Sequence, residues 1–366
     1  MKNRALFVST FGLLLLSSQL WAGRPEAFSK IDAPGAVVTV ASGINNDGYI
    51  AGWYCIQTPC SVSTTNTSEN NPRVRGFVRN LDGTFRLLNA NDCTPGSGDC
   101  NHAVSTQPRQ INPQGVVIGS YFVLERDANG KLKLGPPRQR GFAWCCAGIA
   151  SDDPGTFVYF DPPVELYDNQ DSPSTGTFYN HSVIPTGINA QGDIVGCIHD
   201  KDTMSSMHGF LLHDGAFSIT NPGPATMNSG INPQGETVGL DFMNLTGYRL
   251  DKDGNVLERI YFPGSDETDA WDINGKGEIV GQAVTNNFTV GDAFLRSKQG
   301  DYSYIEPPGV FTASCLAANS NAGLPCTSNA FAIAGNGNVV GNYRDSFANC
   351  SVSACVHGFL LQRGDE

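Results

Sequence analysis

The decapeptide Gly187-Ile188-Asn189-Ala190-Gln191-Gly192-Asp193-Ile194-Val195-Gly196 joins a turn to a short apolar run, and this pattern occurs six times along the chain. The copies lie at residues 43–52, 110–119, 187–196, 230–239, 272–281 and 333–341. Their turn glycines at positions 192, 235 and 277 are 43 and 42 residues apart, whereas the other gaps are longer. The sequence therefore consists of repeats of about 42 residues with insertions between them.

Each copy predicts two strands joined by a tight turn. Asn-x-x-Gly fits a type I turn, and Pro113 and Pro233 occupy the position where proline is favoured. The Ile-Val-Gly that follows is typical of a short buried strand. A further strand such as 208–211 and a hairpin at Asp214-Gly215 come next, and a short segment before the next copy completes four strands.

Four antiparallel strands in about 42 residues are typical of a propeller blade. The sequence therefore predicts an all-β fold, a six-bladed β-propeller of four-stranded blades. The last unit ends after the strand at 357–361, and the chain begins with an unpartnered strand-like segment at 28–35. We expect this N-terminal strand to complete the last blade and close the ring, which removes an open edge.

The repeats resemble the HAF-repeat family of predicted extracellular bacterial propellers. The resemblance rests on His208-Gly209-Phe210, His357-Gly358-Phe359 and Ile31-Asp32-Ala33-Pro34-Gly35, and it covers nearly all of 28–361. Two units depart from the pattern, with Ala334 in the Asn position and Thr246-Gly247-Tyr248 in place of His-Gly-Phe. The resemblance implies an extracellular location and the propeller fold, and it supplies no catalytic residues.

The first 22 residues have the pattern of a secretory signal peptide. Lys2 and Arg4 precede the apolar run 13–16, and cleavage after Ala22 fits the small residue there. This leaves 23–366 as a single propeller domain, in which we expect no segment that inserts into a membrane. The 11 Cys favour an oxidising compartment, secreted or periplasmic, in a bacterium. A formal charge of −12, from 23 Lys+Arg and 35 Asp+Glu, argues against a nucleic-acid partner.

The insertions gather on one predicted face of the ring. Strand direction alternates, so the tight turns share one face and the longer connections share the other, the long-loop face. The insertions lie at 55–75, 88–108, 122–139, 163–185 and 306–330. Long loops on a rigid scaffold often bind partners, and tolerated insertions are an equally good explanation.

Eight cysteines form close pairs within these loops. We expect four local disulfides, which join Cys55 to Cys60, Cys93 to Cys100, Cys315 to Cys326, and Cys350 to Cys355. Zinc ligation is disfavoured because no C-x-x-C cluster is present. Cys145 and Cys146 are expected to be either a vicinal pair or free buried thiols, and Cys197 a small core residue.

Candidate ligand-binding residues come from the position two before the repeated Ile, which should line the ring's centre. Arg109 and Trp271 interrupt a mostly small series there, and Asp272 follows Trp271. A cation, an aromatic side chain and a carboxylate could hold a sugar or an anion, although packing outliers explain them as well. His181, on an inserted link, could also reach the long-loop face. No cofactor motif, metal motif or catalytic nucleophile is recognisable.

These observations predict a non-enzymatic binding module whose partner is an extracellular protein or glycan on the long-loop face. The alternative is a hydrolase or lyase that acts on an extracellular saccharide at the channel mouth. The fold serves both, so a convergent cluster of titratable groups would discriminate between them.

Overall fold

The computed structural model describes residues 27–57, 60, 74–93, 100–102, 105–123, 138–145, 155–168, 181–200, 207–285, 287–288, 290–308, 326–344 and 356–364. The expected signal peptide at 1–22 and much of the expected long loops lie outside these residues. Within them, no helix is long and apolar enough to cross a membrane. The short 3₁₀ turn η1 (Val164–Leu166) is the one helical element in this part of the chain.

Antiparallel strands in sets of four make up almost the whole fold, so the expectation of an all-β propeller is confirmed. The first three sets are β2 (Val38–Ile44), β3 (Ile50–Cys55), β4 (Val74–Arg79), β5 (Phe85–Leu88); β8 (Ser105–Ile111), β9 (Val117–Val123), β10 (Arg138–Cys145), β11 (Thr156–Phe160); and β12 (His181–Ile188), β13 (Ile194–Asp200), β14 (His208–His213), β15 (Ala216–Thr220).

The remaining strands follow the same arrangement. They are β16 (Thr226–Ile231), β17 (Thr237–Asp241), β18 (Thr246–Leu250), β19 (Val256–Ile260); β20 (Glu267–Ile273), β21 (Ile279–Thr285), β22 (Val290–Arg296), β23 (Tyr302–Tyr304); and β24 (Cys326–Ile333), β25 (Val339–Arg344), β26 (Val356–Gln362), which pairs with β1 (Ala27–Ile31). A separate hairpin contains β6 (Asn91–Cys93) and β7 (Cys100–His102).

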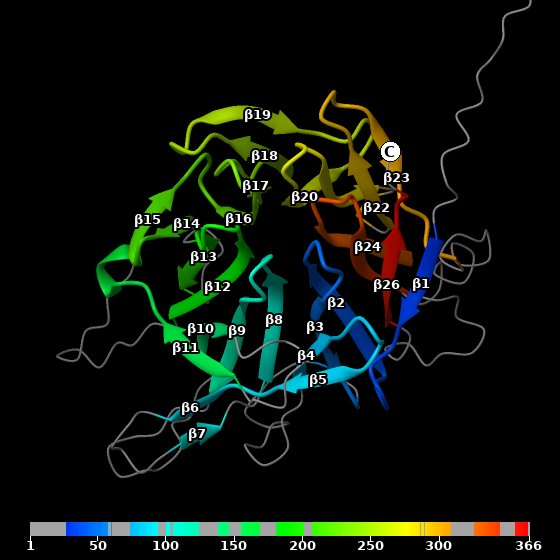
Figure 1. Ribbon diagram of the computed structural model, residues 1–366. Coiled ribbons are helices and arrows are strands. Elements are labelled where there is room, and N and C mark those ends of the chain that lie inside the picture. Colours follow the sequence, from blue (N-terminus) through cyan, green and yellow to red (C-terminus); the bar gives the residue numbers. More distant parts are fainter. Residues whose placement is uncertain are drawn as a thin grey trace, which may run out of the picture.

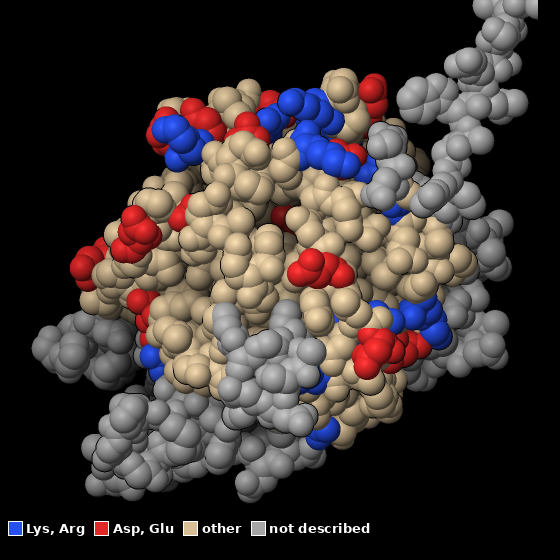
Figure 2. Space-filling model, viewed as in Figure 1, with Lys and Arg blue, Asp and Glu red and all other residues tan. Residues whose placement is uncertain are grey.

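The first strands of the sets form a cycle around a common centre (Figure 1). In the order β2, β8, β12, β16, β20, β24, each strand contacts the next, and β24 contacts β2. We call these six the inner strands. Figure 2 shows a hollow at this centre on the face in view, with acidic atoms visible inside it and with basic and acidic groups together on the side of β18–β23.

Every inner strand has a bulge at the same repeat position. Pairing with the second strand shifts by one residue there, so that a single residue in each strand lacks a direct cross-strand partner. These residues are Ser42, Arg109, Thr186, Ser229, Trp271 and Phe331, the same series that the sequence places at the ring's centre. A bulge bends the strand and re-aims the side chain at that point.

The repeated turns also link neighbouring sets. In the turn at 189–192, the Asn189 side-chain oxygen accepts hydrogen bonds from the N–H groups of Gln191 and Asp193, at 3.0 and 2.9 Å. Gly192 adopts φ 93°, a conformation that favours glycine. The amide of Asn112 then donates to the carbonyl of Asn189 at 3.2 Å, joining one turn to the next. The turn motif therefore holds the sets together as well as reversing the chain.

The core lies between the sheets and explains why Ile-Val-Gly and the third-strand aromatic residue recur together. Each third strand buries an aromatic ring at the equivalent position, at 0–1% exposure, and β10 also buries Trp144; the equivalent rings are Phe77, Phe142, Phe210, Tyr248, Phe294 and Phe359. A Cβ on Gly281 would lie 2.7 Å from the Phe294 ring and would also meet the Asp269 carbonyl oxygen. Glycine is required on the second strand because the ring and a neighbouring backbone occupy its side-chain space.

Candidate functional site

Two side chains from opposite inner strands meet at the centre of the ring. β8 and β20 are three places apart in the cycle of six, yet Gln110 Nε2 donates to Asp272 Oδ2 at 3.0 Å. Gln110 Oε1 in turn accepts from the N–H groups of Ile44 and Ile111, at 3.2 and 2.9 Å. This pair, which we call the floor, therefore ties three inner strands together.

Asp272 is buried and fully engaged in the floor. Its carboxylate also accepts from the N–H groups of Ile273 and Ile333, at 2.9 and 3.0 Å. Burial raises the pKa of Asp272 to about 7, although these hydrogen bonds and that of Gln110 act to lower it. Gly230 leaves space for the Asp272 side chain, because a Cβ at position 230 would collide with that side chain. Asp272 thus holds the centre together, and its hydrogen-bonding capacity is used within the protein.

Arg109 immediately precedes Gln110 and is a bulge residue. Its Nη2 donates to Gln107 Oε1 at 3.2 Å, whereas its Nε is buried without a hydrogen-bond partner. No carboxylate among the described residues pairs with this guanidinium, and burial lowers its pKa. The site therefore contains a cation that no carboxylate of the described residues neutralises.

Trp271 is the corresponding bulge residue on the opposite strand. Its ring meets that of Phe331 edge-on, with centroids 5.5 Å apart, and it packs against the cluster of Cys197, Met207, Met227 and Leu240. The indole Nε1 is buried without a partner. Arg109 also acts electrostatically on Cys197, so both bulge residues approach the same part of the centre.

Two carboxyl groups lie on the same strand as Trp271. Asp269 is 8% exposed, and its Oδ1 has no partner. Burial, with the neighbouring charge of Glu267, raises the pKa of Asp269 to about 8. Burial also raises the pKa of Glu267. Asp269 is consequently protonated at neutral pH, and its side chain hydrogen-bonds to Glu267, which leaves Oδ1 as an acceptor.

We group Arg109, Ser229, Asp269, Trp271 and Phe331 as the axial cluster. Four of them carry a buried polar atom without a partner: Arg109 Nε, Ser229 Oγ, Asp269 Oδ1 and Trp271 Nε1. They are four of twelve such atoms in the described part of the chain, which also include Arg249 Nε and Arg296 Nε, so the chemistry of the cluster rather than this count makes it a candidate site. The cluster offers a cation, hydrogen-bond donors and aromatic rings.

His181 is not part of this cluster. It is 8% exposed, and its ring stacks on Tyr167 with centroids 4.2 Å apart and planes 9° apart. Side chains alternate along a strand, which puts His181 on the same side of β12 as Val183 and opposite to Ile184. The structure therefore brings together Arg109, Trp271 and Asp272 of the expected residues, and it leaves His181 in a separate packed environment.

The sequence placed Ser229 at the centre without making it a candidate, whereas Asp269 and Gln110 escaped the sequence interpretation altogether. Gln110 had a readable signal, because the position before the repeated Ile reads Gly43, Gln110, Gly187, Gly230, Asp272 and Ala332. Two large polar residues in a series of glycine and alanine indicate a shared role. No sequence pattern singled out Asp269, because its burial and its unpartnered oxygen depend on packing against residues that are distant in the sequence.

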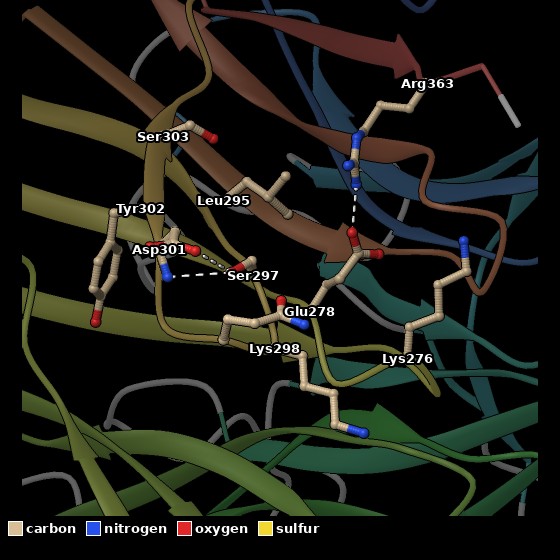
Figure 3. A pocket seen from close by; sticks show the side chains of 10 residues that line it. Lys276, Glu278, Leu295, Ser297, Lys298, Asp301, Tyr302, Ser303 and Arg363 are labelled. Atoms are coloured by element: carbon tan, nitrogen blue, oxygen red, sulfur yellow. Dashed lines mark hydrogen bonds and ion pairs between the residues drawn. The ribbon is translucent and has the colours of Figure 1, made fainter. Parts of the chain in front are cut away.

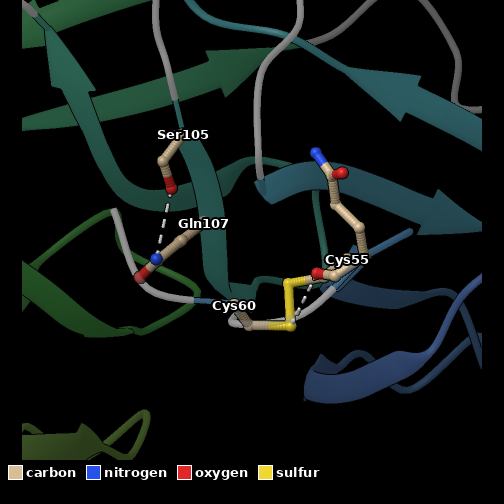
Figure 4. Close-up of a disulfide and its surroundings, with 5 residues drawn as sticks. Cys55, Cys60, Ser105 and Gln107 are labelled. Atoms are coloured by element: carbon tan, nitrogen blue, oxygen red, sulfur yellow. Dashed lines mark hydrogen bonds between the residues drawn. A yellow bond between two sulfur atoms is a disulfide. The ribbon is translucent and has the colours of Figure 1, made fainter. Parts of the chain in front are cut away.

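One expected disulfide is present, between Cys55 and Cys60, with Cα atoms 5.9 Å apart (Figure 4). Figure 4 shows Ser105 and Gln107 nearby, where Gln107 Nε2 donates to Ser105 Oγ at 3.2 Å. The disulfide thus neighbours the glutamine that holds Arg109.

The other cysteines divide into two groups. Cys93 lies opposite Cys100 in the β6–β7 backbone pairing, and a disulfide between them stays a prediction. The Cys315–Cys326 and Cys350–Cys355 disulfides also stay predictions, because Cys315, Cys350 and Cys355 lie outside the described residues. Cys145 is disulfide-bonded, which excludes a free thiol there, and Cys146 lies outside the described residues. Cys197 is a free core cysteine as expected, and burial raises its pKa to about 12.

A second concave region lies beside the β22–β23 turn, with a volume of about 380 Å³ (Figure 3). Arg363 Nη1 donates to Glu278 Oε1 at 2.9 Å, and Asn274 Nδ2 donates to Glu278 Oε2 at 2.7 Å. Burial acts to raise the pKa of Glu278, but these donors outweigh it and lower the pKa. Glu278, one of two acidic residues in the pocket lining, is therefore already hydrogen-bonded within the protein.

Comparison with known proteins gives a fold likeness and no family. No family model matches the chain, and no curated protein matches it. Among solved structures, a streptogramin B lyase has a TM-score of 0.43 and 11% identity over 92% of this chain and 98% of that one. Virginiamycin B lyase from Staphylococcus aureus has a TM-score of 0.43 and 9% identity over 92% and 100% of the two chains. Regucalcin from Agrobacterium tumefaciens, a calcium-binding protein, has a TM-score of 0.43 and 11% identity over 92% and 95%.

Proposed function

We propose that the protein is a secreted or periplasmic, six-bladed HAF-repeat propeller that binds an extracellular saccharide without transforming it. In this proposal the 1–22 segment directs export, and β1 closes the ring by completing the blade of β24–β26. The antiparallel register of Ala27–Ile31 with β26 supports the closure. So does the hydrogen bond from the Gly335 N–H to Asn46 Oδ1, which joins the last turn to the first.

The observation that carries the binding function is the set of polar atoms in the axial cluster, above all the Arg109 guanidinium, which has no carboxylate partner among the described residues. A propeller that needed its centre only for packing would fill it with apolar or mutually hydrogen-bonded side chains, as the floor does. Trp271 and Phe331 add aromatic surface beside these atoms. Ligand sites in proteins combine such apolar walls with a few fixed polar groups.

The second candidate is a saccharide hydrolase or lyase, and the Asp269–Glu267 pair favours it. A carboxyl group with a pKa of about 8 remains protonated at neutral pH, as a general acid must. Glycoside hydrolysis also uses two carboxyl groups. We place this candidate second because Asp269 and Glu267 lie on one strand, and a pair of carboxyl groups that flanks a scissile bond needs separate walls.

A panel of neutral and acidic oligosaccharides tests both candidates with the full-length mature chain. We expect saturable binding by calorimetry, no released product by mass spectrometry, and at least about tenfold weaker binding for Trp271→Ala. Arg363→Gln, which alters the β22–β23 pocket instead, should bind like the parent. Product formation that Asp269→Asn abolishes would establish the enzyme, and binding unaffected by Trp271→Ala would refute the axial site.

A further inference from the structure

The charge of Arg109 gives more information about the ligand, provided that the axial cluster is the binding site proposed above. Among the other partly buried arginines, Arg344 has no carboxylate partner in the described part of the chain, but three others do: Arg140 pairs with Asp161 at 2.7 Å, Arg249 with Glu236 at 2.8 Å, and Arg296 with Glu258 at 2.7 Å. Arg109 has the neutral Gln107 instead. A buried cation without a counter-ion is costly, so its retention at this position needs a compensating partner.

The opposite wall does not supply that partner. Asp269 shares a side-chain hydrogen bond with Glu267, and none of the salt bridges of the described residues joins it to Arg109. Asp269 is also protonated at neutral pH. Asp272 is held by Gln110 and two backbone N–H groups, directed at the floor. No carboxylate of the described residues therefore neutralises the guanidinium, which is available to the anion of a ligand.

The geometry of the guanidinium favours a carboxylate. Gln107 fixes one of its edges through Nη2, while the Nε–H is buried and unused. A planar fork of this kind matches a carboxylate, which can accept two parallel hydrogen bonds. Trp271, across the centre from Arg109, offers an aromatic face and a free indole N–H, and Asp269 Oδ1 offers an acceptor to hydroxyl groups.

We propose that the axial cluster binds a uronic-acid residue of an extracellular polysaccharide, with the uronate carboxylate on Arg109 and the sugar ring against Trp271 and Phe331. Its hydroxyl groups pair with Ser229, Asp269 and the indole N–H. The floor, made by Gln110 and Asp272, closes the centre near the ends of the inner strands. The saccharide therefore approaches from the side on which the inner strands begin. Arg109 thus selects acidic over neutral sugars.

The test compares trigalacturonate with its methyl ester, which keeps the sugar ring and removes the charge. We expect the parent protein to bind trigalacturonate at least about thirtyfold more tightly than the ester, and Arg109→Gln to abolish that preference. Gln107→Glu tests the same point without removing the arginine, because the new carboxylate would neutralise Arg109 in place. Arg363→Gln is the matched control, and circular dichroism checks that each variant is folded.

The outcomes separate this inference from the proposed function. If the acid and the ester bind equally and both need Trp271, saccharide binding stands and the role of Arg109 is wrong. If acetate or a peptide carboxylate competes as tightly as trigalacturonate, the site recognises carboxylates and the uronate assignment is overturned. If no saccharide of the panel binds, both proposals fail.

Discussion

At the scale of single residues, two aspartates on one strand take different roles, one in the floor and one in the axial cluster. Asp272 and Asp269 lie on β20, three positions apart, and burial raises the pKa of both. Asp272 uses its oxygens on Gln110, Ile273 and Ile333, whereas Asp269 keeps Oδ1 unpartnered. Their hydrogen bonds rather than their residue type therefore separate a structural carboxylate from a candidate binding group.

The raised pKa of Asp269 predicts a pH dependence of stability. Its carboxyl binds a proton more readily in the folded than in the unfolded chain, so this contribution is complete below about pH 4 and declines until about pH 8. The slope from one group is at most about 1.4 kcal/mol per pH unit. Urea unfolding between pH 7 and 8 should show this decline in the parent protein and a flatter profile in Asp269→Asn.

The matched control for this prediction is Asp253→Asn, because Asp253 is exposed on a hairpin. It should reproduce the parent slope. Equal slopes for the parent and Asp269→Asn would show that Asp269 is ionised throughout this range.

At the scale of the elements, the repeat joins its strands through one glycine–aromatic contact. Gly281 on β21 lies beneath the ring of Phe294 on β22, and the equivalent Gly341 lies beneath Phe359. The sequence shows the two recurring motifs, Ile-Val-Gly and x-Gly-Phe, but it does not show that their glycine and phenylalanine are in contact. This contact depends on the register of the β21–β22 pairing, which places Gly281 opposite Phe294.

Replacing that glycine should destabilise its set of strands. Gly281→Ala introduces a Cβ that meets the Asp269 carbonyl oxygen and the Phe294 ring, so we expect a loss of about 1–3 kcal/mol in the free energy of unfolding. Gly275→Ala serves as the control, since its Cβ would lie 3.6 Å from Pro233, an ordinary contact. Denaturant unfolding of both variants measures the difference, and equal stabilities would contradict the packing described here.

At the scale of the whole molecule, local and long-range features differed in how well the sequence predicted them. Turns such as that of Asn189 and Gly192 were predictable because their hydrogen bonds span four residues or fewer. The floor was not, since Gln110 and Asp272 are 162 positions apart in the chain. His181 was misplaced because its partner Tyr167 belongs to an insertion without a repeated pattern. The fold was thus predictable from the repeats, and the site only from their exceptions.

The proposed closure of the ring by β1 predicts a global effect from an N-terminal residue. Ile31 is 2% exposed and packs in one cluster with Ala41, Ile44 and Val340, which belong to both ends of the chain. Ile31→Ala should lower the free energy of unfolding by about 2–5 kcal/mol in a single cooperative transition. Leu87→Ala, at a side chain that is 50% exposed, should change it little. A separate early transition confined to the N-terminus would contradict closure.

The bulges of the inner strands have a consequence for how this scaffold can diversify. A bulge residue has no direct cross-strand partner, so exchanging it leaves the sheet's hydrogen-bonding ladder intact. Residues as different as Ser42, Arg109 and Trp271 occupy equivalent places for this reason. Duplication of one repeat followed by substitution at the bulges alone could therefore generate new specificities, with the repeated turns and glycines unchanged. Thr186 and Ser229 are the positions at which a new specificity could be engineered first.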